Sequence, residues 1–172
     1  MENFEFFAFD NDKFCPINLG IRVNPYPNTK EGLEMNNTHR KGIRWYHNSK
    51  KVEIKDSDYV KGYPTVEMDG VVAIYSSKSK IYPEPANAVI YNPDGSFRMR
   101  IEVPDELLSS NAKRIKPRKD KCFFFQAGWA LNSKGEKVNS IWIGFANGEY
   151  FEVRELNTET GEFGELLTYG RM

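Results

Sequence analysis

The chain has 172 residues, a formal net charge of zero from 24 basic and 24 acidic side chains, and an aromatic content of 14%. This length fits one domain with its own core, and we expect a single β-rich domain over residues 1–172. The balanced charge provides no overall field for nucleic acid or an anionic membrane, and the residue composition argues against disorder. The aromatic content favours pleated sheets.

From the N-terminal part of the sequence we expect neither a signal peptide nor regular secondary structure over residues 10–40. Its first residues, Met1–Phe6, carry acids where a secretion signal needs positive charge. No window of the chain approaches the roughly 18 apolar residues of a membrane-spanning segment. We therefore expect a cytoplasmic protein without membrane contact. Residues 10–40 are polar and rich in turn formers, which predicts a long loop.

Turn signals separate short apolar runs from residue 65 to the C-terminus. Asn-Gly and Asp-Gly pairs suit the positive φ angles of tight hairpin turns. The pattern predicts a mainly β fold, an antiparallel meander that forms a sandwich, a partly closed barrel or propeller-like sheets, with at most one or two short helices. The signals are Asp69-Gly70, Asn92–Gly95, Lys134–Glu136, Asn147-Gly148 and Glu159–Glu162.

The apolar patterning within these runs predicts which sides of the strands are covered. Apolar and charged residues alternate over 97–103 and over 151–154, so that Glu152 and Arg154 would face solvent. The run Cys122–Phe125 is apolar at every position, which predicts a central strand covered on both sides. One short helix is expected to start near Pro104–Leu108, because proline and acids suit a first helical turn.

The chain carries no recognisable motif for catalysis, cofactor binding or metal binding. His39 and His47 lie in no pattern that would supply a general base with an orienting partner. No phosphate-binding glycine motif, zinc spacing or calcium loop is present. We predict a non-enzyme without cofactor or metal, although scattered residues could still assemble an active site. Cys15 and Cys122 have apolar neighbours and are expected to be buried free thiols.

Charged residues are segregated near the C-terminus. Lys113–Lys121 contains six bases and one acid, whereas 149–171 contains six acids and two bases. The basic run is expected to be a solvated loop, with contacts to RNA phosphates as the alternative. The acidic hairpin is either a solvated sheet face or a docking surface for a basic partner. For the docking surface, we select Glu149, Glu152 and Glu155 as candidate partner-binding residues.

A second candidate interface lies at Arg44–His47, which contains Trp45 and Tyr46. Tyrosine, tryptophan and arginine are the side chains that most often anchor protein interfaces. In a β protein they are also ordinary strand residues, so this assignment has a structural alternative.

One part of the sequence supports a resemblance to a known group of proteins. The stretch Ala88–Ile101, with Asn92-Pro93-Asp94-Gly95 at its centre, resembles a segment common in small bacterial proteins encoded beside secreted toxins. The glycine-containing hairpins from Trp142 to Tyr169 are similar to the same group. Members of this group act as immunity proteins of contact-dependent inhibition and related polymorphic toxin systems. The resemblance implies a partner, a cognate toxin domain such as a nuclease, whose active site or substrate channel the protein would block.

Two other functions are compatible with the sequence. A β-barrel or sandwich could bind a small molecule or sugar in a deep apolar cavity lined by Trp129, Trp142 or Phe145. RNA binding through Lys113–Lys121 is a further alternative, although the run lacks interleaved aromatic residues for base stacking. The sequence leaves the oligomeric state open.

Overall fold

The computed structural model describes residues 1–8, 13–21, 24–37 and 41–172. Within these residues the chain forms twelve strands in three antiparallel sheets of four strands each, and two short α-helices. The prediction of a mainly β fold is therefore confirmed. The three sheets of the described residues form no closed barrel.

The N-terminal sheet has the strand order β2-β1-β3-β4. A long connection joins β2 to β3 and contains helix α1, which contacts β1 and β2. The elements are β1 (Glu2–Ala8), β2 (Lys13–Pro16), α1 (Lys30–Asn37), β3 (Gly42–His47) and β4 (Lys50–Lys55).

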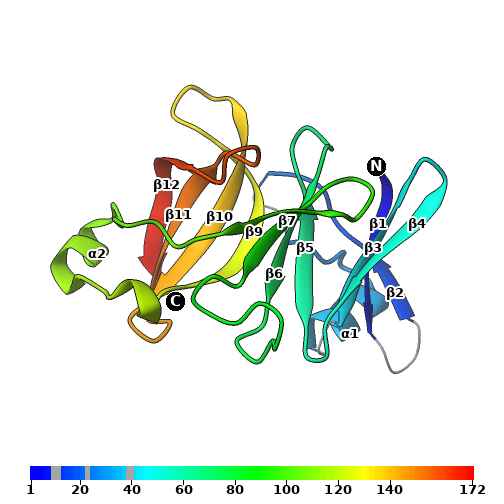
Figure 1. The fold of residues 1–172 in the computed structure, drawn as a ribbon, viewed down its shortest axis with the longest axis horizontal. Helices are drawn as coiled ribbons and strands as arrows, with labels where there is room; N and C mark the ends of the chain where they lie inside the picture. The colour runs from blue at the N-terminus through cyan, green and yellow to red at the C-terminus, as the bar shows by residue number, and fades with distance from the viewer. Residues whose placement is uncertain (9–12, 22–23, 38–40) are drawn as a thin grey trace.

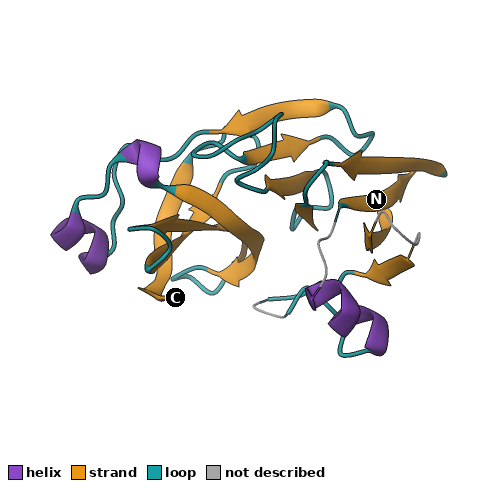
Figure 2. Cartoon of the chain, turned by 90° about the horizontal axis from the view of Figure 1, so that it is seen from below, coloured by secondary structure: helices purple, strands orange, loops and turns teal. Residues whose placement is uncertain are grey.

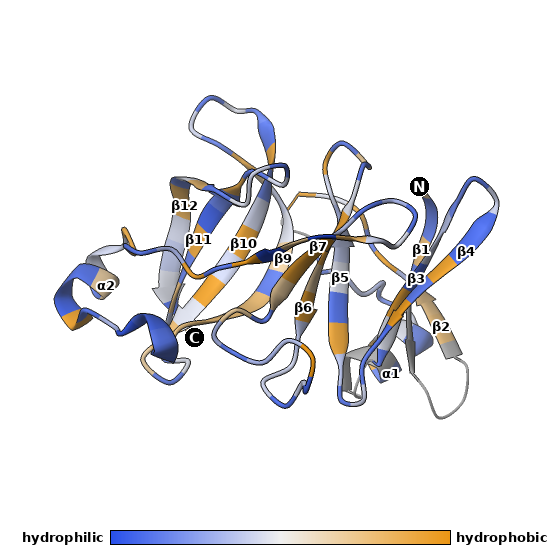
Figure 3. Cartoon of the chain, in the orientation of Figure 1, coloured by the Kyte–Doolittle hydropathy of each residue, from blue (hydrophilic) through white to orange (hydrophobic). Residues whose placement is uncertain are grey.

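The middle sheet is a meander with the order β5-β6-β7-β8, comprising β5 (Val60–Pro64), β6 (Val71–Tyr75), β7 (Ala88–Tyr91) and β8 (Phe97–Ile101). Every residue of β6 and β7 is buried. These two central strands are mostly hydrophobic in Figure 3, and they form the middle of the core.

The C-terminal sheet has the order β12-β11-β10-β9, with β9 (Phe123–Leu131), β10 (Lys137–Phe145), β11 (Tyr150–Leu156) and β12 (Phe163–Arg171). Between β8 and β9 the chain leaves the sheets and forms helix α2 (Ser110–Ile115) and the short 3-10 helix η1 (Lys119–Lys121). Helix α2 projects at one end of the molecule (Figure 1).

The three sheets follow one another in sequence order along the long axis of the molecule (Figure 1). Strand β5 contacts β3 of the N-terminal sheet and β9 of the C-terminal sheet, and β6 also contacts β9. Seen from below in Figure 2, the sheets form an open arc.

The run Cys122–Phe125 occupies a different place from the predicted one. It leads into β9, which is an edge strand of its sheet and not a central strand. Phe124 is buried on the side that faces the middle sheet, but Phe123 and Phe125 are only half-buried on the other side. The run is apolar throughout because one side of β9 packs against β5 and β6 and the other side carries half-buried aromatic rings.

The helices also differ from the predictions. Helix α2 begins at Ser110, after the expected start, because the Ser109 hydroxyl accepts a hydrogen bond from the Ala112 N–H (3.3 Å) and caps the helix there. The described parts of the predicted loop at 10–40 contain β2 and helix α1. The Thr29 hydroxyl caps α1 by accepting from the Gly32 N–H (3.1 Å). Glycine and asparagine have low helix propensity, so α1 has a weak sequence signal.

The predicted burial over 97–103 is confirmed in part. Ile101 and Val103 are buried, but Phe97 is 54% exposed on the edge strand β8. Cys15 and Cys122 are both buried free thiols, as expected.

Candidate partner-binding face

One side of the C-terminal sheet is lined with half-buried aromatic rings and faces the inside of the arc. Directly opposite residues in an antiparallel pair point to the same side of a sheet, so the strand register identifies this side. We call it the open face. Its rows are Phe123–Gly144–Phe151–Gly170, Gln126–Trp142–Val153–Thr168 and Gly128–Ser140–Glu155.

Glycines in the strands allow the aromatic rings of the open face to lie against the backbone. A Cβ atom at Gly144 would lie 2.5 Å from the Phe123 ring, and one at Gly170 would lie 3.0 Å from the Phe151 ring. Phe151 also makes an edge contact with Phe125, with ring centroids 6.2 Å apart. Side chains at the two glycines would displace the rings, so the glycines are required for this placement of the aromatic side chains.

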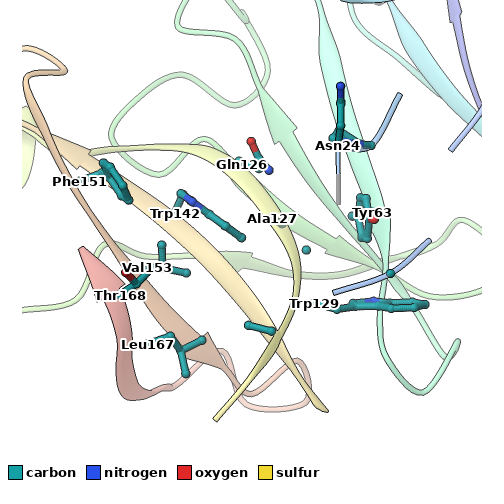
Figure 4. Close-up of a pocket in the computed structure, with 14 residues that line it drawn as sticks. Asn24, Tyr63, Gln126, Ala127, Trp129, Trp142, Phe151, Val153, Leu167 and Thr168 are labelled. Atoms are coloured by element: carbon teal, nitrogen blue, oxygen red, sulfur yellow. The ribbon is translucent and has the colours of Figure 1, made fainter. Parts of the chain in front are cut away.

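A groove of about 460 Å³ lies over the open face (Figure 4). Trp142 and Phe151 form part of its floor, and Tyr63 and Trp129 lie on its opposite side (Figure 4). An adjoining hollow of about 180 Å³ shares Tyr63 with it. The remaining lining residues are Gly20, Asn24, Pro25, Gln126, Ala127, Gly128, Ala130, Val153, Leu167 and Thr168.

Hydrogen bonds fix the wall of the groove that comes from the N-terminal part of the chain. The Tyr63 hydroxyl donates to the Asn18 carbonyl oxygen. The Asn18 side-chain amide donates to the carbonyl oxygens of Asn24 (3.1 Å) and Tyr26 (3.0 Å). On the neighbouring side, the Trp129 indole N–H donates to the Pro64 carbonyl oxygen (2.8 Å). The groove is therefore held by specific bonds in the folded protein.

Glu155 lies opposite Ser140 in the row next to that of Trp142, and it does not line the groove. Its side chain is half-buried over Gly164, and it forms no hydrogen bond or ion pair with the part of the chain that the structure describes. A second hollow of about 280 Å³ begins at Glu155 and is also lined by Glu67, Asp69, Glu159 and Lys137. Lys137 lies over the Trp129 ring and Glu67 accepts a hydrogen bond from Asn139, so this hollow lies at the rim of the sheet and not on the open face alone.

The prediction that Glu152 and Arg154 face solvent is wrong. Glu152 is 0% exposed and Arg154 is 6% exposed, and both point into the molecule from β11. The Glu152 carboxylate accepts hydrogen bonds from the backbone N–H groups of Leu108 (3.2 Å) and Ser109 (2.9 Å), and from Arg154 (3.4 Å). Glu152 thus anchors the segment before α2, and in this conformation a partner cannot reach it.

The other candidate residues lie at separate places. Glu149 is exposed in the turn between β10 and β11 and forms an ion pair with Arg171 (2.7 Å). It is six residues from Glu155 along the strand, a separation of about 20 Å. Trp45 in β3 is completely buried, with its indole N–H donating to the Pro93 carbonyl oxygen (2.7 Å), whereas Tyr46 is half-buried. The structure therefore does not gather the predicted residues on one surface.

The basic run Lys113–Lys121 extends from the second half of α2 to the end of η1, and all six of its basic side chains are exposed. Arg118 pairs with Asp120 (2.8 Å) and Lys119 pairs with Asp105 (2.8 Å). These pairs neutralise part of the run, consistent with a solvated surface.

The described residues contain no cluster of three or more His, Cys, Asp or Glu side chains that could hold a metal ion. The His47 ring contacts the Asn48 side chain (3.3 Å), and His39 lies outside the described residues. None of the helices in the described ranges has the length and apolar character needed to cross a membrane.

The sequence analysis did not identify Phe123, Phe125 and Phe151 as residues of a partly exposed face, because aromatic residues in strands usually belong to the core. The glycines within the strands, Gly144 and Gly170, were the available signal, since interior glycines often mark close approach of another group.

Comparison with known proteins shows a likeness in fold. No protein-family model matches the chain. No curated protein sequence matches it either. Among solved structures, it is similar to a chain in the structure of Tne2 in complex with Tni2, with a TM-score of 0.64 and 10% sequence identity. The alignment covers 96% of this chain and 96% of that chain.

Proposed function

We propose that this chain is an immunity-type protein that binds a cognate toxin domain and neutralises it by covering the active site. The observation that carries the proposal is the fold match over 96% of both chains to a member of the Tne2–Tni2 complex. The resemblance of Ala88–Ile101 and of the C-terminal hairpins to immunity proteins supports the same function. The proposal places the protein in the cytoplasm as a single non-enzymatic domain.

The architecture is suited to this function. An inhibitor needs a rigid scaffold, a few well-placed aromatic anchors and complementary charge, and it needs no catalytic group. The open face offers half-buried aromatic rings beside a groove of about 460 Å³. A separate hollow of about 280 Å³, which includes the exposed acids Glu67 and Glu159, would suit a basic surface on the partner, such as the substrate channel of a nuclease.

The test is co-expression of this chain with the product of the neighbouring gene, which is the expected toxin. We expect the neighbouring product alone to stop growth, and co-expression of this chain to restore it. Size-exclusion chromatography of the purified pair should give a stable one-to-one complex. If the neighbouring product is toxic but this chain neither binds it nor restores growth, the proposed function is wrong.

A small-molecule site is the second candidate function, because Trp129 and Trp142 both line the groove. Phe145, however, is completely buried and does not line it, and the groove is open along one side. Small-molecule sites usually enclose most of the ligand surface, whereas an open groove is more typical of a protein interface. Thermal-shift measurements with a panel of sugars would test this candidate, and a concentration-dependent rise in melting temperature would support it.

A further inference from the structure

We propose that the groove and its adjoining hollow receive a loop of the partner protein that carries a carboxylate side chain next to an apolar one. The carboxylate bonds to the Lys61 ammonium group in the hollow of about 180 Å³, and the apolar side chain lies in the groove against Trp142. This inference deepens the proposed function and rests on it for the identity of the partner.

A single charged side chain lines the two spaces. Among the described residues, those around the groove are all uncharged, and Lys61 alone is charged around the hollow. Neither lining includes a carboxylate from the described part of the chain. An anionic group that enters the hollow therefore meets one positive charge and no like charge. A carboxylate carries one negative charge, so it is electrostatically complementary to this site.

Contacts at the joint between the middle and C-terminal sheets fix the position of Lys61. The residue lies in β5, opposite Ile74 of β6. Its ammonium group donates to the Phe125 carbonyl oxygen (3.0 Å) and lies over the Tyr59 ring, 5.7 Å from the ring centroid. A carbonyl oxygen and an aromatic ring orient the ammonium group and carry no negative charge. Since an ammonium group has three N–H donors, a bound carboxylate adds a charge-assisted hydrogen bond to these contacts.

The hollow and the groove open into each other around β9. The residues that line both spaces are Asn24, Pro25, Tyr63, Gln126 and Ala127. Trp142 lies opposite Gln126 in the strand register, and its ring extends over Gly128 of β9. Gly128 is three residues from Phe125, whose carbonyl oxygen holds Lys61, which corresponds to about 10 Å along a strand. Two adjacent residues of a loop, with Cα atoms about 3.8 Å apart, reach both places when their side chains diverge.

The lining favours a carboxylate beside an apolar side chain over other occupants. A nucleic-acid backbone gains affinity from several basic contacts, whereas the described lining offers one. A cationic side chain would meet Lys61 as a like charge. The rings of Trp142 and Phe151 are half-buried, so an apolar side chain in the groove removes their remaining apolar surface from water. The Gln126 amide lines both spaces and offers a donor and an acceptor to the backbone of the loop.

The first experiment uses a peptide in place of the unidentified partner. An acetylated, amidated Gly-Glu-Leu-Gly peptide is titrated into the ¹⁵N-labelled protein, with Gly-Gln-Leu-Gly and sodium acetate as controls. We expect the glutamate peptide to shift the Trp142 indole N–H and the Ala127 amide resonances, whereas the indole resonance of the buried Trp45 stays in place. The glutamine peptide should bind about fivefold more weakly. Equal binding of the two peptides, or the same shifts with acetate alone, would overturn the proposal.

Variants then separate local pairing from overall charge. Lys61→Gln should weaken binding of the glutamate peptide by about fivefold and leave binding of the glutamine peptide nearly unchanged. Lys50→Gln makes the same charge change at an exposed site of β4 that lines neither space, and it should affect neither peptide. Equal losses for Lys50→Gln and Lys61→Gln, or equal losses of both peptides for Lys61→Gln, would refute the pairing. The comparison of the two peptides leaves the protein unchanged, so it keeps the test valid if Lys61→Gln folds poorly.

The same variants are tested against the product of the neighbouring gene, which distinguishes this inference from the proposed function. If the wild-type chain and Lys50→Gln bind that product and Lys61→Gln binds it at least about fivefold more weakly, both stand. If the wild-type chain and both variants bind equally, the hollow beside Lys61 is the wrong site and the proposed function stands. If the wild-type chain does not bind, the proposed function fails, and the peptide titration alone decides whether the groove and its hollow bind a carboxylate.

Discussion

Replacement of Glu152 by alanine tests whether this buried carboxylate holds the C-terminal sheet to the segment before α2. The side chain is 0% exposed and accepts hydrogen bonds from the backbone N–H groups of Leu108 (3.2 Å) and Ser109 (2.9 Å). It also accepts from Arg154 (3.4 Å), which is 6% exposed. Glu152→Ala would leave two backbone donors and a buried guanidinium without this acceptor.

The expected loss of stability is large. Removal of one member of a buried ion pair costs about 3–5 kcal/mol, because the remaining charge is uncompensated. Arg154 keeps its bonds to the Gly164 carbonyl oxygen (2.8 and 3.1 Å), which favours the lower end of this range. A loss of about 3 kcal/mol in a chain of this size lowers the melting temperature by roughly 6–12 °C. Glu152→Gln keeps one acceptor for the Ser109 N–H and should fall between the wild type and Glu152→Ala.

Thermal and urea unfolding, followed by circular dichroism, would measure these differences. Glu149→Ala is the matched control, since Glu149 is exposed and its pair with Arg171 should contribute less than about 1 kcal/mol. A melting temperature for Glu152→Ala within 1 °C of the wild type would refute the assigned role of the carboxylate. An equal decrease for Glu149→Ala would point to net charge as the cause.

Three further predictions follow from other buried groups. Burial raises the pKa of the Cys122 thiol to about 11. We therefore expect alkylation of this thiol at pH 8 to be slow in the native protein and fast in urea. Equal rates in the two conditions would contradict its burial. The buried Asn87 side-chain amide donates to the carbonyl oxygens of Tyr75 (2.7 Å) and Phe124 (2.8 Å), and its oxygen accepts from the Phe124 N–H (2.9 Å). Asn87→Ala should therefore lower the free energy of unfolding, measured in urea, by at least about 2 kcal/mol. A smaller loss would show that these bonds are dispensable. Burial raises the pKa of Tyr91 to about 12 and raises that of Tyr75, while the unfolded side chains titrate near 10. Above pH 10 the folded protein then holds more protons than the unfolded chain, so its free energy of unfolding should fall as the pH rises from about 10 to 12. A Tyr75→Phe, Tyr91→Phe double variant should show a shallower fall over this range. An unchanged slope would contradict the assignment of the effect to these two tyrosines.

The hairpins could be predicted from the sequence because their turns are local. Gly95 (φ 85°), Gly135 (φ 78°) and Gly148 (φ 85°) have the positive φ angles that the turn signals implied. Gly70 is different, because its φ angle is not positive and Met68 (φ 57°) has the left-handed conformation instead. A Cβ atom at Gly70 would lie 2.9 Å from the Tyr91 carbonyl oxygen, so space explains this glycine.

The side of the sheet that faces solvent could not be read from alternation alone. Glu152 lies in a strand where acids normally point outward, but its hydrogen-bond partners Leu108 and Ser109 are 44 and 43 residues away in sequence. Likewise, Trp142 and Glu155 come to the same side of the sheet only through the register of β10 and β11. Period-two patterning shows that two sides exist, whereas contacts between distant segments decide which side is buried.

The joint between the middle and C-terminal sheets determines the shape of the groove. On the buried side, the Asn87 side chain accepts from the Phe124 N–H and donates to the Phe124 carbonyl oxygen. These two bonds join β9 to the segment that leads into β7 of the middle sheet. Nearby, the Lys61 ammonium group donates to the Phe125 carbonyl oxygen (3.0 Å). Directional bonds of this kind restrict the angle between the two sheets more than apolar packing alone would. A groove with fixed walls loses little conformational freedom when a partner binds, which favours the tight, long-lived complex that the proposed function requires.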